Sequence, residues 1–500
     1  MGLRESPYAS RLLAGADAAA RALLFPSYWL TSHLLALRKT TVEEQACRGR
    51  RGLCALEAVL QAPGLLLLLL LSAPLLLLGL LAWLPLQAAR RPFAYQHTPS
   101  QAPPEEWALP GQGQRAFRFL SANVCLLPEG LAKFSNLFRT QWRAGRIAQD
   151  LARAVHPSAA LPDLGLGDAP NEQTYGATED ALWRATDVAI EMPLDGAGQA
   201  PVLGEIRASF PPKADFLCLQ EVFDRRAATR VRHLLGPHYA HIIYDVGTYG
   251  LVGCALKLLN SGLFLASRYP VLAVKYHCYP NGKGEDAFSA KGLLCVQVKL
   301  GSFRGQRIVG YLNCTHLQAP EGDAQIRYDQ LSLSLLWAQL FQDTNGQAGD
   351  TVAFDIYCGD LNFDNCSPDD QLEQTHEIFT LYTDPCRIGP RKDKPWAIGT
   401  LTNYLKIYDK AVSTPEKMKR TLSCPEGRRK YLAGPILANG HPDLSGGWSE
   451  GRRIDYLMYR EHSGPAELRT AVEKVSFITQ LATCSDHLPV GLQLLVASVA

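Results

Sequence analysis

The stretch TVAFDIYCGDLN, residues 351–362, decides the fold of this chain. Most of its first eight residues are apolar, a composition typical of a buried β-strand. The polar cluster Gly359-Asp360-Leu361-Asn362 follows directly. A rigid strand that ends in a carboxylate and an amide presents both groups at one edge of a sheet. The stretch therefore predicts a core strand that delivers functional side chains at its end.

The same arrangement recurs five more times along the chain. Strand-like runs border short polar clusters at Ser121-Ala122-Asn123, Gln220-Glu221, Asn313-Cys314-Thr315-His316, Arg453-Ile454-Asp455 and Ser485-Asp486-His487. A single Asp or His after a strand is more often an ordinary turn residue. Six clusters in one chain, all with oxygen or imidazole side chains, favour a shared site.

Strands outnumber helices and alternate with them irregularly. The strand-like runs are 117–124, 215–220, 241–244, 262–266, 293–300, 307–315, 352–358, 454–459 and 490–496. Apolar residues at helical spacing predict helices over 132–155, 225–235 and 323–341. This order predicts a layered α/β sandwich rather than a strictly alternating parallel sheet.

The residue types of the six clusters indicate their chemistry. Glu, Asp and Asn offer hard oxygen ligands, which suit Mg²⁺. A His that an Asp orients beside such a cation suits the activation of water. The sequence has no Cys/His ligand spacing, no Gly-x-Ser-x-Gly elbow and no Walker loop. It therefore predicts metal-assisted hydrolysis of a phosphoester.

A long apolar run precedes the predicted sandwich. Residues 64–86 are 23 positions without a charge, and residues 65–71 are all leucine. A helix of this length reaches about 34 Å, enough to cross a hydrocarbon core of about 30 Å. Pro74 divides the run into two arms, so a hairpin that dips into one leaflet fits as well as a span. The run predicts a helical membrane-anchoring segment.

A second apolar stretch, residues 12–37, suits an interfacial or re-entrant helix because it carries aromatic residues and Pro26. Basic residues flank the leucine run on both sides: Arg38, Lys39, Arg48, Arg50, Arg51, Arg90 and Arg91. This symmetry favours two segments anchored from one side of the bilayer. The basic residues would then contact anionic phospholipid head groups.

Cysteines beside the apolar run are candidates for lipidation. Cys47 and Cys54 are candidate palmitoylation sites, with an unmodified thiol as the alternative. Met1-Gly2 with Ser6 fits the loose N-myristoylation pattern. The 13 cysteines include no CxxC pair, and many lie in apolar runs. Such buried, reduced thiols predict a body that faces the cytosol.

Charge divides the chain of 500 residues into two parts. Residues 1–91 hold 10 Lys and Arg against 5 Asp and Glu, whereas the rest holds 40 against 43. The near-neutral total argues against nucleic acid as the main partner. We expect a membrane-associated hydrophobic module at 1–91 and a linker rich in Pro, Gln and Gly at 92–114. The catalytic domain would fill 115–500, with a flexible insertion at about 158–204.

The six clusters, in this order, resemble the endonuclease/exonuclease/phosphatase superfamily. Its marks are an early Asn, a Gln-Glu, a Gly-Asp-x-Asn and a terminal Ser-Asp-His, which here span about 120–490. Within it, three further segments are similar to neutral sphingomyelinases: Asn260-Ser261-Gly262-Leu263, Ser267-Arg268-Tyr269-Pro270-Val271 and Ser289-Ala290-Lys291-Gly292. The two apolar segments are similar to those of the membrane-anchored mammalian members.

The resemblance implies a fold and an activity. The fold would be α/β (α+β), a four-layer DNase I-like sandwich of two mixed sheets flanked by helices. The activity would be a Mg²⁺-dependent, phospholipase C type hydrolysis of membrane sphingomyelin to ceramide and phosphocholine. Activation by anionic phospholipid is also implied. The resemblance points to mitochondria, endoplasmic reticulum or other inner membranes, and no obligate protein partner is evident.

The resemblance also implies roles for the metal-site residues. Glu221 would bind Mg²⁺, with Mn²⁺ as an alternative metal. Asn123 would help to place the metal or the phosphate, and Asp486 would contact the metal site. Asp286 and Lys291 match a pair that switches the site between inactive and active forms. From the sequence alone that pair is a surface ion pair worth about 0–1 kcal/mol.

The remaining roles are catalytic. His487 would be the general base on water, and Asp455 would hold its tautomer. Asp360 and Asn362 would orient the water and the phosphate. His316 would hydrogen-bond the phosphate oxygens.

Three rival functions use the same fold. A nuclease predicts a basic, aromatic-rich groove and no membrane segment, which the acidic balance and the leucine run oppose. An inositol phosphate phosphatase needs a dense Lys/Arg pocket, and basic residues near the motifs are sparse. A catalytically silent membrane scaffold would have no reason to keep Glu221, Asp360, Asn362 and His487.

Overall fold

The computed structural model describes most of the chain. The described residues are 3–47, 51–99, 104–109, 113–155, 204–252, 255–437, 439, 441–443, 450–462 and 468–498, without the side chains of 51–55, 57 and 252. The insertion predicted at about 158–204 lies, except for residue 204, outside the described residues. Gly2 and the side chain of Cys54 lie outside them as well.

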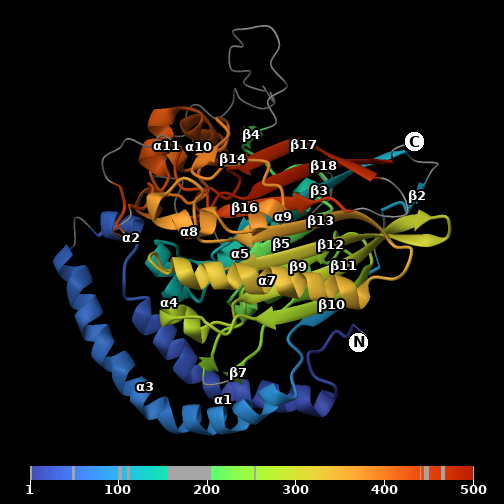
Figure 1. The fold of residues 1–500 in the computed structure, drawn as a ribbon. Coiled ribbons are helices and arrows are strands. Elements are labelled where there is room, and N and C mark those ends of the chain that lie inside the picture. The colour runs from blue at the N-terminus through green and yellow to red at the C-terminus, as the bar shows by residue number, and fades with distance from the viewer. Residues whose placement is uncertain are drawn as a thin grey trace.

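Two mixed β-sheets form the body (Figure 1). The eight-stranded sheet has the order β1 (Ala94–His97), β6 (His241–Tyr244), β9 (Phe264–Ser267), β5 (Phe216–Gln220), β3 (Gln114–Asn123), β18 (Val490–Ser498), β17 (Leu468–Ile478) and β4 (Gly204–Arg207). The six-stranded sheet has the order β10 (Val271–Cys278), β11 (Gly292–Phe303), β12 (Gln306–His316), β13 (Thr351–Asp360) and β16 (Asp455–Arg460), with β2 (Trp107–Leu109) paired to β11.

The two sheets pack face to face through large buried side chains. Phe354 of β13 meets Phe119 of β3 and Phe216 of β5, with ring centroids 4.9 and 5.3 Å apart. Helices α5 (Thr140–Val155) and α6 (Arg225–Leu235) bury their apolar faces on the eight-stranded sheet. Helix α7 (Ala324–Asn345) covers the six-stranded sheet (Figure 1). These four layers confirm the predicted sandwich.

Smaller elements complete the body. They are α4 (Glu129–Ala132), β7 (Gly250–Val252), β8 (Ala255–Lys257), the 3₁₀ helix η4 (Gly284–Phe288), α8 (Gln371–Gln374), α9 (Ile378–Leu381), β14 (Arg387–Gly389), β15 (Lys392–Asp393), α10 (Pro415–Leu422) and α11 (Pro425–Tyr431).

All nine predicted strands form, but the helix expected over 132–155 is shorter. The chain makes α4 and a 3₁₀ turn before α5 begins at Thr140. Asn136 and Arg139 interrupt the helix because their φ angles of 58° and 55° are left-handed. The apolar spacing alone did not reveal this break.

The interval 92–114, predicted as a linker, contributes strands to both sheets. β1 pairs antiparallel with β6, and β2 pairs parallel with β11. Trp107 of β2 is fully buried in the core between the two sheets. The linker prediction rested on the content of Pro, Gln and Gly. Composition alone does not show whether a short segment will pair with a strand at the edge of a sheet.

The N-terminal segment folds as three helices, α1 (Arg11–Leu35), α2 (Thr41–Ala46) and α3 (Arg51–Ala88). α1 and α3 are antiparallel neighbours: Ser27 Oγ lies 2.7 Å from Ser72 Oγ, and Gln87 Nε2 lies 3.3 Å from Asp17 Oδ1. α3 curves around α1 beneath the body (Figure 1). Residues Ala58–Ala88 of α3 are long and apolar enough to cross a membrane, with a mean hydropathy of 2.8.

Pro74 does not divide α3 into two arms, contrary to that expectation. Pro63, Pro74 and Pro85 all lie inside one helix of 38 residues. Each proline removes one backbone hydrogen bond, which can bend a helix without ending it. A hairpin that turns at Pro74 is therefore not the conformation of α3.

The N-terminal helices also contact the β-sandwich body. Tyr28 of α1 donates a hydrogen bond of 3.0 Å to Asp224, the residue that caps α6. The backbone N–H of Gly130 donates to Ser32 Oγ at 3.2 Å. Lys133 Nζ lies 2.8 Å from Glu43 Oε1 of α2. The module predicted as an anchor thus packs on loops that leave β3 and β5.

Candidate active site

Strand register brings the polar clusters to one end of the sheets. His316 of β12 is the register partner of Asp360 at the end of β13, and Asp360 is the partner of Asp455 at the start of β16. In the other sheet Asn123 is the partner of Gln220. β12 and β13 end, and the antiparallel β16 begins, at the same edge of the sheet. Side chains far apart in sequence therefore meet in one site.

His487 and Asp455 form a buried pair. His487 Nδ1 lies 2.8 Å from Asp455 Oδ2. Ser485 supports the loop because its hydroxyl donates to the Asn123 carbonyl at 2.7 Å and accepts from the His487 backbone N–H at 3.2 Å. Burial lowers the pKa of His487, but Asp455, Asp360 and Asp486 outweigh this and raise it well above its usual value.

Asp360 lies at the centre of the site. Its Oδ2 lies 3.8 Å from His487 Nε2, 3.5 Å from His316 Nε2 and 2.9 Å from Asn123 Nδ2. The same Asn123 amide donates to Glu221 Oε1 at 3.1 Å. Burial raises the pKa of Asp360 to about 7, with Asp455 and Glu221 adding to the rise and His487 and Asn123 opposing it.

His316 is a neutral imidazole at the floor of the site. Burial, followed by the charges of Lys291 and His487, lowers the pKa of His316 well below its usual value. Among the described residues, neither ring nitrogen has a hydrogen-bond partner although both are buried. A ring nitrogen without a partner beside Asp360 is therefore available to a ligand.

A tight turn holds Glu221 against the site. Glu221 has a left-handed φ of 60°, and the Val222 N–H donates to the Gly262 carbonyl at 2.8 Å. A Cβ on Gly262 would lie 2.9 Å from the Glu221 nitrogen. Gly262 also has a φ of 72°, so a glycine is required there for two reasons. Gly262 belongs to a segment that the sequence singled out.

Thr400 is a positioning residue that sequence reasoning missed. Its hydroxyl accepts hydrogen bonds from the backbone N–H groups of Ile454 at 3.0 Å and Asp455 at 3.1 Å. Its carbonyl accepts from Leu488 N–H at 2.8 Å. Thr400 therefore fixes both members of the His487–Asp455 pair from a segment without a recognisable motif.

The backbone of Leu317 joins Lys291 to Asn362. The Leu317 carbonyl accepts from Lys291 Nζ at 2.9 Å and from Asn362 Nδ2 at 3.1 Å. Lys291 Nζ also lies 2.8 Å from Asp286 Oδ2. The pair is buried, so the expectation of a plain surface ion pair is wrong. The Leu317 carbonyl links this ion pair to Asn362, one of the predicted site residues.

The donor set fits a hard divalent cation. Glu221 and Asp360 offer carboxylate oxygens on either side of Asn123, and crowding by Asp486 adds to burial in raising the pKa of Glu221. One oxygen of Asp486 is buried without a hydrogen-bond partner among the described residues. A cation would relieve this concentration of negative charge. Asn123 points its NH₂ at the carboxylates because its Oδ1 accepts from the Cys125 N–H at 3.0 Å.

Cysteines elsewhere are reduced in the described part of the chain. Cys218, Cys314 and Cys358 bring their sulfurs within 4.8 Å of one another in the core below the site. Cys47 is half-buried and accepts from Lys39 Nζ at 3.2 Å.

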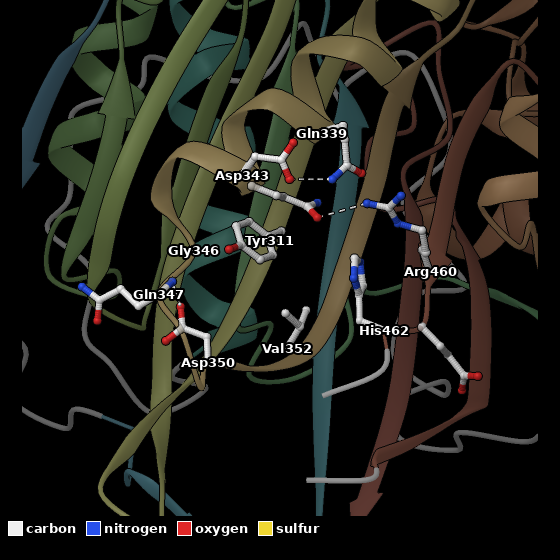
Figure 2. Close-up of a pocket in the computed structure, with 11 residues that line it drawn as sticks. Tyr311, Gln339, Asp343, Gly346, Gln347, Asp350, Val352, Arg460 and His462 are labelled. Atoms are coloured by element: carbon white, nitrogen blue, oxygen red, sulfur yellow. Dashed lines mark hydrogen bonds between the residues drawn. The ribbon is translucent and has the colours of Figure 1, made fainter. Parts of the chain in front are cut away.

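A pocket of about 460 Å³ lies away from the site, between the C-terminal end of α7, the start of β13 and the end of β16 (Figure 2). Tyr311, Val352, Arg460 and His462 line it, with Gln342 hydrogen-bonded to Arg460 at 3.1 Å. No residue predicted for catalysis or metal binding lines this pocket.

The fold and the site define the class of the protein. Two mixed sheets deliver carboxylates, two histidines and an amide to one end, and an Asp orients one of the histidines. This arrangement is that of a phosphoesterase with a DNase I-like sandwich, and its donor set is one that could hold a metal ion.

Comparisons with known proteins narrow the class. Residues 195–487 match the "Endonuclease/Exonuclease/phosphatase family", and residues 12–89 match the "Neutral sphingomyelinase N-terminal transmembrane region". The chain is 41% identical to Sphingomyelin phosphodiesterase 5 of Danio rerio, over 99% of both chains. It is 36% identical to Sphingomyelin phosphodiesterase 3 of Rattus norvegicus, over 100% of this chain and 99% of that one.

A solved structure, Sphingomyelinase C from Streptomyces griseocarneus, aligns with 76% of this chain and 99% of its own, at 15% identity and a TM-score of 0.40. The full-length relatives show that the chain belongs to the neutral sphingomyelinase family. The resemblance drawn from the motifs is thereby confirmed.

Proposed function

We propose that the protein hydrolyses sphingomyelin at a membrane surface to ceramide and phosphocholine, with Mg²⁺ as its cofactor. The observation that carries this proposal is the convergence of His487, His316 and Asn123 on one oxygen of Asp360, at 3.8, 3.5 and 2.9 Å. Relatives named sphingomyelin phosphodiesterase match the whole chain and support this substrate.

Glu221 would hold the metal, with Asp486 beside it and Asn123 fixing the carboxylate orientation. When bound, Mg²⁺ offsets the charge of these carboxylates and of the phosphoryl oxygens. Mn²⁺ offers similar oxygen chemistry and is the alternative metal.

His487 would remove a proton from the attacking water. Asp455 accepts the Nδ1–H of His487, which leaves Nε2 free to take that proton, and stabilises the imidazolium that forms. Once charge around Asp360 and Asp486 is offset, the pKa of His487 falls toward the range of a useful base. The water oxygen bonds to phosphorus while the bond from phosphorus to the ceramide oxygen breaks. The departing oxygen takes a proton from solvent to give the ceramide hydroxyl, and His487 later returns its proton to solvent.

The remaining residues would orient the phosphate. His316 can donate to a phosphoryl oxygen because its ring nitrogens are free of other hydrogen bonds among the described residues. The Asn362 backbone N–H donates to Asp360 Oδ1 at 3.0 Å, so the two residues move together and place the water and the phosphate. Excess negative charge on the phosphate is thus met by fixed donors.

Asp286 and Lys291 would regulate this centre. Their ion pair reaches the centre through the Leu317 carbonyl, which Asn362 also contacts. Breaking the pair would free the backbone of Leu317, which adjoins His316 and accepts a hydrogen bond from Asn362. We include this pair in the proposal as the regulatory element.

The N-terminal helices would anchor the enzyme to membranes inside the cell, with the body facing the cytosol. α3 would lie in the bilayer, and the basic residues at 38–51 would contact anionic phospholipids. Cys47 and Cys54 remain candidate lipidation sites that would reinforce this anchor. We infer no nucleic-acid partner, since the charge balance of the body is slightly acidic.

The test is hydrolysis of sphingomyelin, phosphatidylcholine and nicked plasmid DNA by the full chain, each with Mg²⁺ or EDTA. We expect phosphocholine release from sphingomyelin that requires Mg²⁺ and disappears in His487→Ala. DNA cutting without phosphocholine release would move the protein to the nuclease branch. Absence of any turnover in the folded wild type would support the silent scaffold instead.

A further inference from the structure

Three exposed apolar side chains lie on β7, directly after β8 and on η4, and these neighbouring elements lie beside the end of α3. Leu251 of β7 is 71% exposed, Leu258 after β8 is 46% exposed, and Phe288 at the end of η4 is 50% exposed. We name these three residues the apolar rim. Grouped apolar side chains at a protein surface mark contact with a partner or with lipid.

The end of α3 is fixed to the loop that precedes β7. Trp83 and Tyr249 pack edge to face, with ring centroids 5.9 Å apart. Arg90 Nη2 lies 2.7 Å from Asp245 Oδ2, and the Arg90 side chain also donates to the Gly247 carbonyl at 2.7 Å. β7 therefore cannot move independently of the C-terminal end of α3.

Gly250 lets α3 approach the backbone of β7 closely. A Cβ there would lie 3.2 Å from Gln87 Cβ and 3.7 Å from Leu84 Cδ2, so α3 touches the β7 backbone directly. Leu251 is the next residue, about 3.4 Å further along the strand. The strand β7, which bears Leu251, thus lies beside the C-terminal end of α3 (Figure 1).

The position of α3 decides what covers the rim. Ala58–Ala88 is long and apolar enough for a bilayer, and only 11% of its most apolar window is buried in the protein. The helix changes from apolar to basic at Arg90 and Arg91, so its C-terminal end marks the boundary between hydrocarbon and water. Leu251, fixed to that end, must lie at the same boundary.

Hydrogen bonds hold the other two rim residues to the same unit. Lys257 Nζ donates to the Ala287 carbonyl at 2.8 Å. The backbone N–H groups of Leu258 and Leu259 both donate to the Phe288 carbonyl, at 2.8 and 3.0 Å. Leu251, Leu258 and Phe288 therefore move as one surface.

η4 also leads to the catalytic residues. Asp286 of η4 accepts from Lys291 Nζ at 2.8 Å and from the Ala319 N–H at 2.7 Å. Lys291 then reaches the Leu317 carbonyl that Asn362 shares. These hydrogen bonds link η4 to Leu317, which adjoins His316 and accepts from Asn362.

We propose that the apolar rim inserts into the surface of the bilayer that holds α3, and so places the catalytic residues against the lipid from which the substrate is taken. This inference rests on the proposed sphingomyelin hydrolysis and adds the surface of the body that meets the membrane. The occupant is phospholipid, because α3 brings the rim to the lipid boundary.

The test compares Leu251→Glu and Phe288→Glu with Leu336→Glu and Leu340→Glu on α7, whose side chains are 54% and 50% exposed. Full-length variants are assayed on sphingomyelin in phosphatidylcholine vesicles and on short-chain sphingomyelin below its micelle concentration. We expect the rim variants to lose about ten-fold or more of their activity on vesicles and to keep their activity on soluble substrate. The new carboxylate resists insertion into a bilayer but does not affect access of a soluble substrate. The α7 variants should match the wild type in both assays.

The outcomes separate the two proposals. Equal activity of rim and α7 variants on vesicles overturns the docking surface while the proposed function stands. Equal loss on both substrates overturns it too, because the rim then serves the site rather than the bilayer. If the wild type turns over neither substrate, the proposed function fails.

A second measurement, fluorescence quenching of an added tryptophan, introduces no charge into the protein. Phe288→Trp and Leu336→Trp each add one indole to the full chain in vesicles with brominated acyl chains. We expect the added fluorescence to be quenched at residue 288 and not at residue 336. Equal quenching at both positions, or quenching at neither, contradicts insertion of the rim.

Discussion

Asp455 Oδ2 lies 2.8 Å from Nδ1 of His487, and both side chains are buried. The aspartate holds the imidazole with Nε2 directed at Asp360, 3.8 Å away. Since Thr400 anchors the backbone of Asp455, the orientation of His487 depends on three separate segments of the chain. The predictions below follow from this geometry and from the contacts around it.

Asp455→Asn should lower kcat about 10²–10⁴-fold and change KM little, because the amide no longer selects the tautomer with a free Nε2. Turnover of sphingomyelin at saturating Mg²⁺ measures this. Asp329→Asn, an exposed change on α7, is the matched control and should retain full activity. An active Asp455→Asn enzyme would exclude His487 as the base.

Glu221→Gln should lower activity about 100-fold or more and raise the Mg²⁺ concentration needed for half-maximal rate. It should also abolish the rise in Tm that Mg²⁺ gives the wild type, because ligand binding to the folded state stabilises it. Glu416→Gln at an exposed position of α10 is the control. An unchanged thermal response to Mg²⁺ would place the metal elsewhere.

Gly262→Ala should impair catalysis beyond its effect on stability. Both Gly262 and Gly305 have left-handed φ angles, 72° and 79°, but only Gly262 has neighbours that a Cβ would contact. Each alanine should destabilise by about 1 kcal/mol through φ alone. Only Gly262→Ala should also shift Glu221 and reduce turnover. Equal activity of the two variants would show that the close approach to Glu221 does not matter.

Lys291→Ala should reduce activity about ten-fold or more, because it leaves Asp286 without its cation and releases the Leu317 carbonyl. Circular dichroism checks that the fold is intact. Lys133→Ala removes a similarly buried lysine from Glu43 and serves as the control for loss of an ion pair. Full activity of folded Lys291→Ala would remove the pair from the regulatory scheme.

Asp245→Asn should loosen the attachment of α3 in a pH-dependent way. Burial raises the pKa of Asp245, but Arg90, Arg225 and Arg21 outweigh burial and lower it to about 2. Because the folded pKa lies below that of an unfolded Asp, about 3.9, the wild type gains about 2 kcal/mol at neutral pH. This advantage over Asp245→Asn is complete above about pH 5 and is lost as the pH falls toward 2.

Urea unfolding of the full chain in detergent between pH 3 and 7 measures that difference. Asp343→Asn changes an exposed carboxylate on α7 that accepts a hydrogen bond from Gln339, and it should show no such dependence. A difference between wild type and Asp245→Asn that stays constant over this range would contradict the assignment.

The sequence by itself determined the sandwich, its nine main strands and the set of catalytic candidates. These features are local in sequence. An apolar run predicts a buried strand, and the polar cluster next to it in the sequence must lie at the end of that strand. The leucine run likewise predicted a membrane helix from composition alone. Each of these inferences depends on residues that are neighbours along the chain.

Only the tertiary structure decided how those pieces meet. Register placed His316 and Asp455 on either side of Asp360, and the Cys125 N–H turned the Asn123 amide toward the carboxylates. Tertiary contacts also give the interval 92–114 its two strands and join Asp245 to Arg90. The helix α3 stays continuous through Pro74. These outcomes depend on contacts between segments far apart in the chain, whose energies no local pattern encodes.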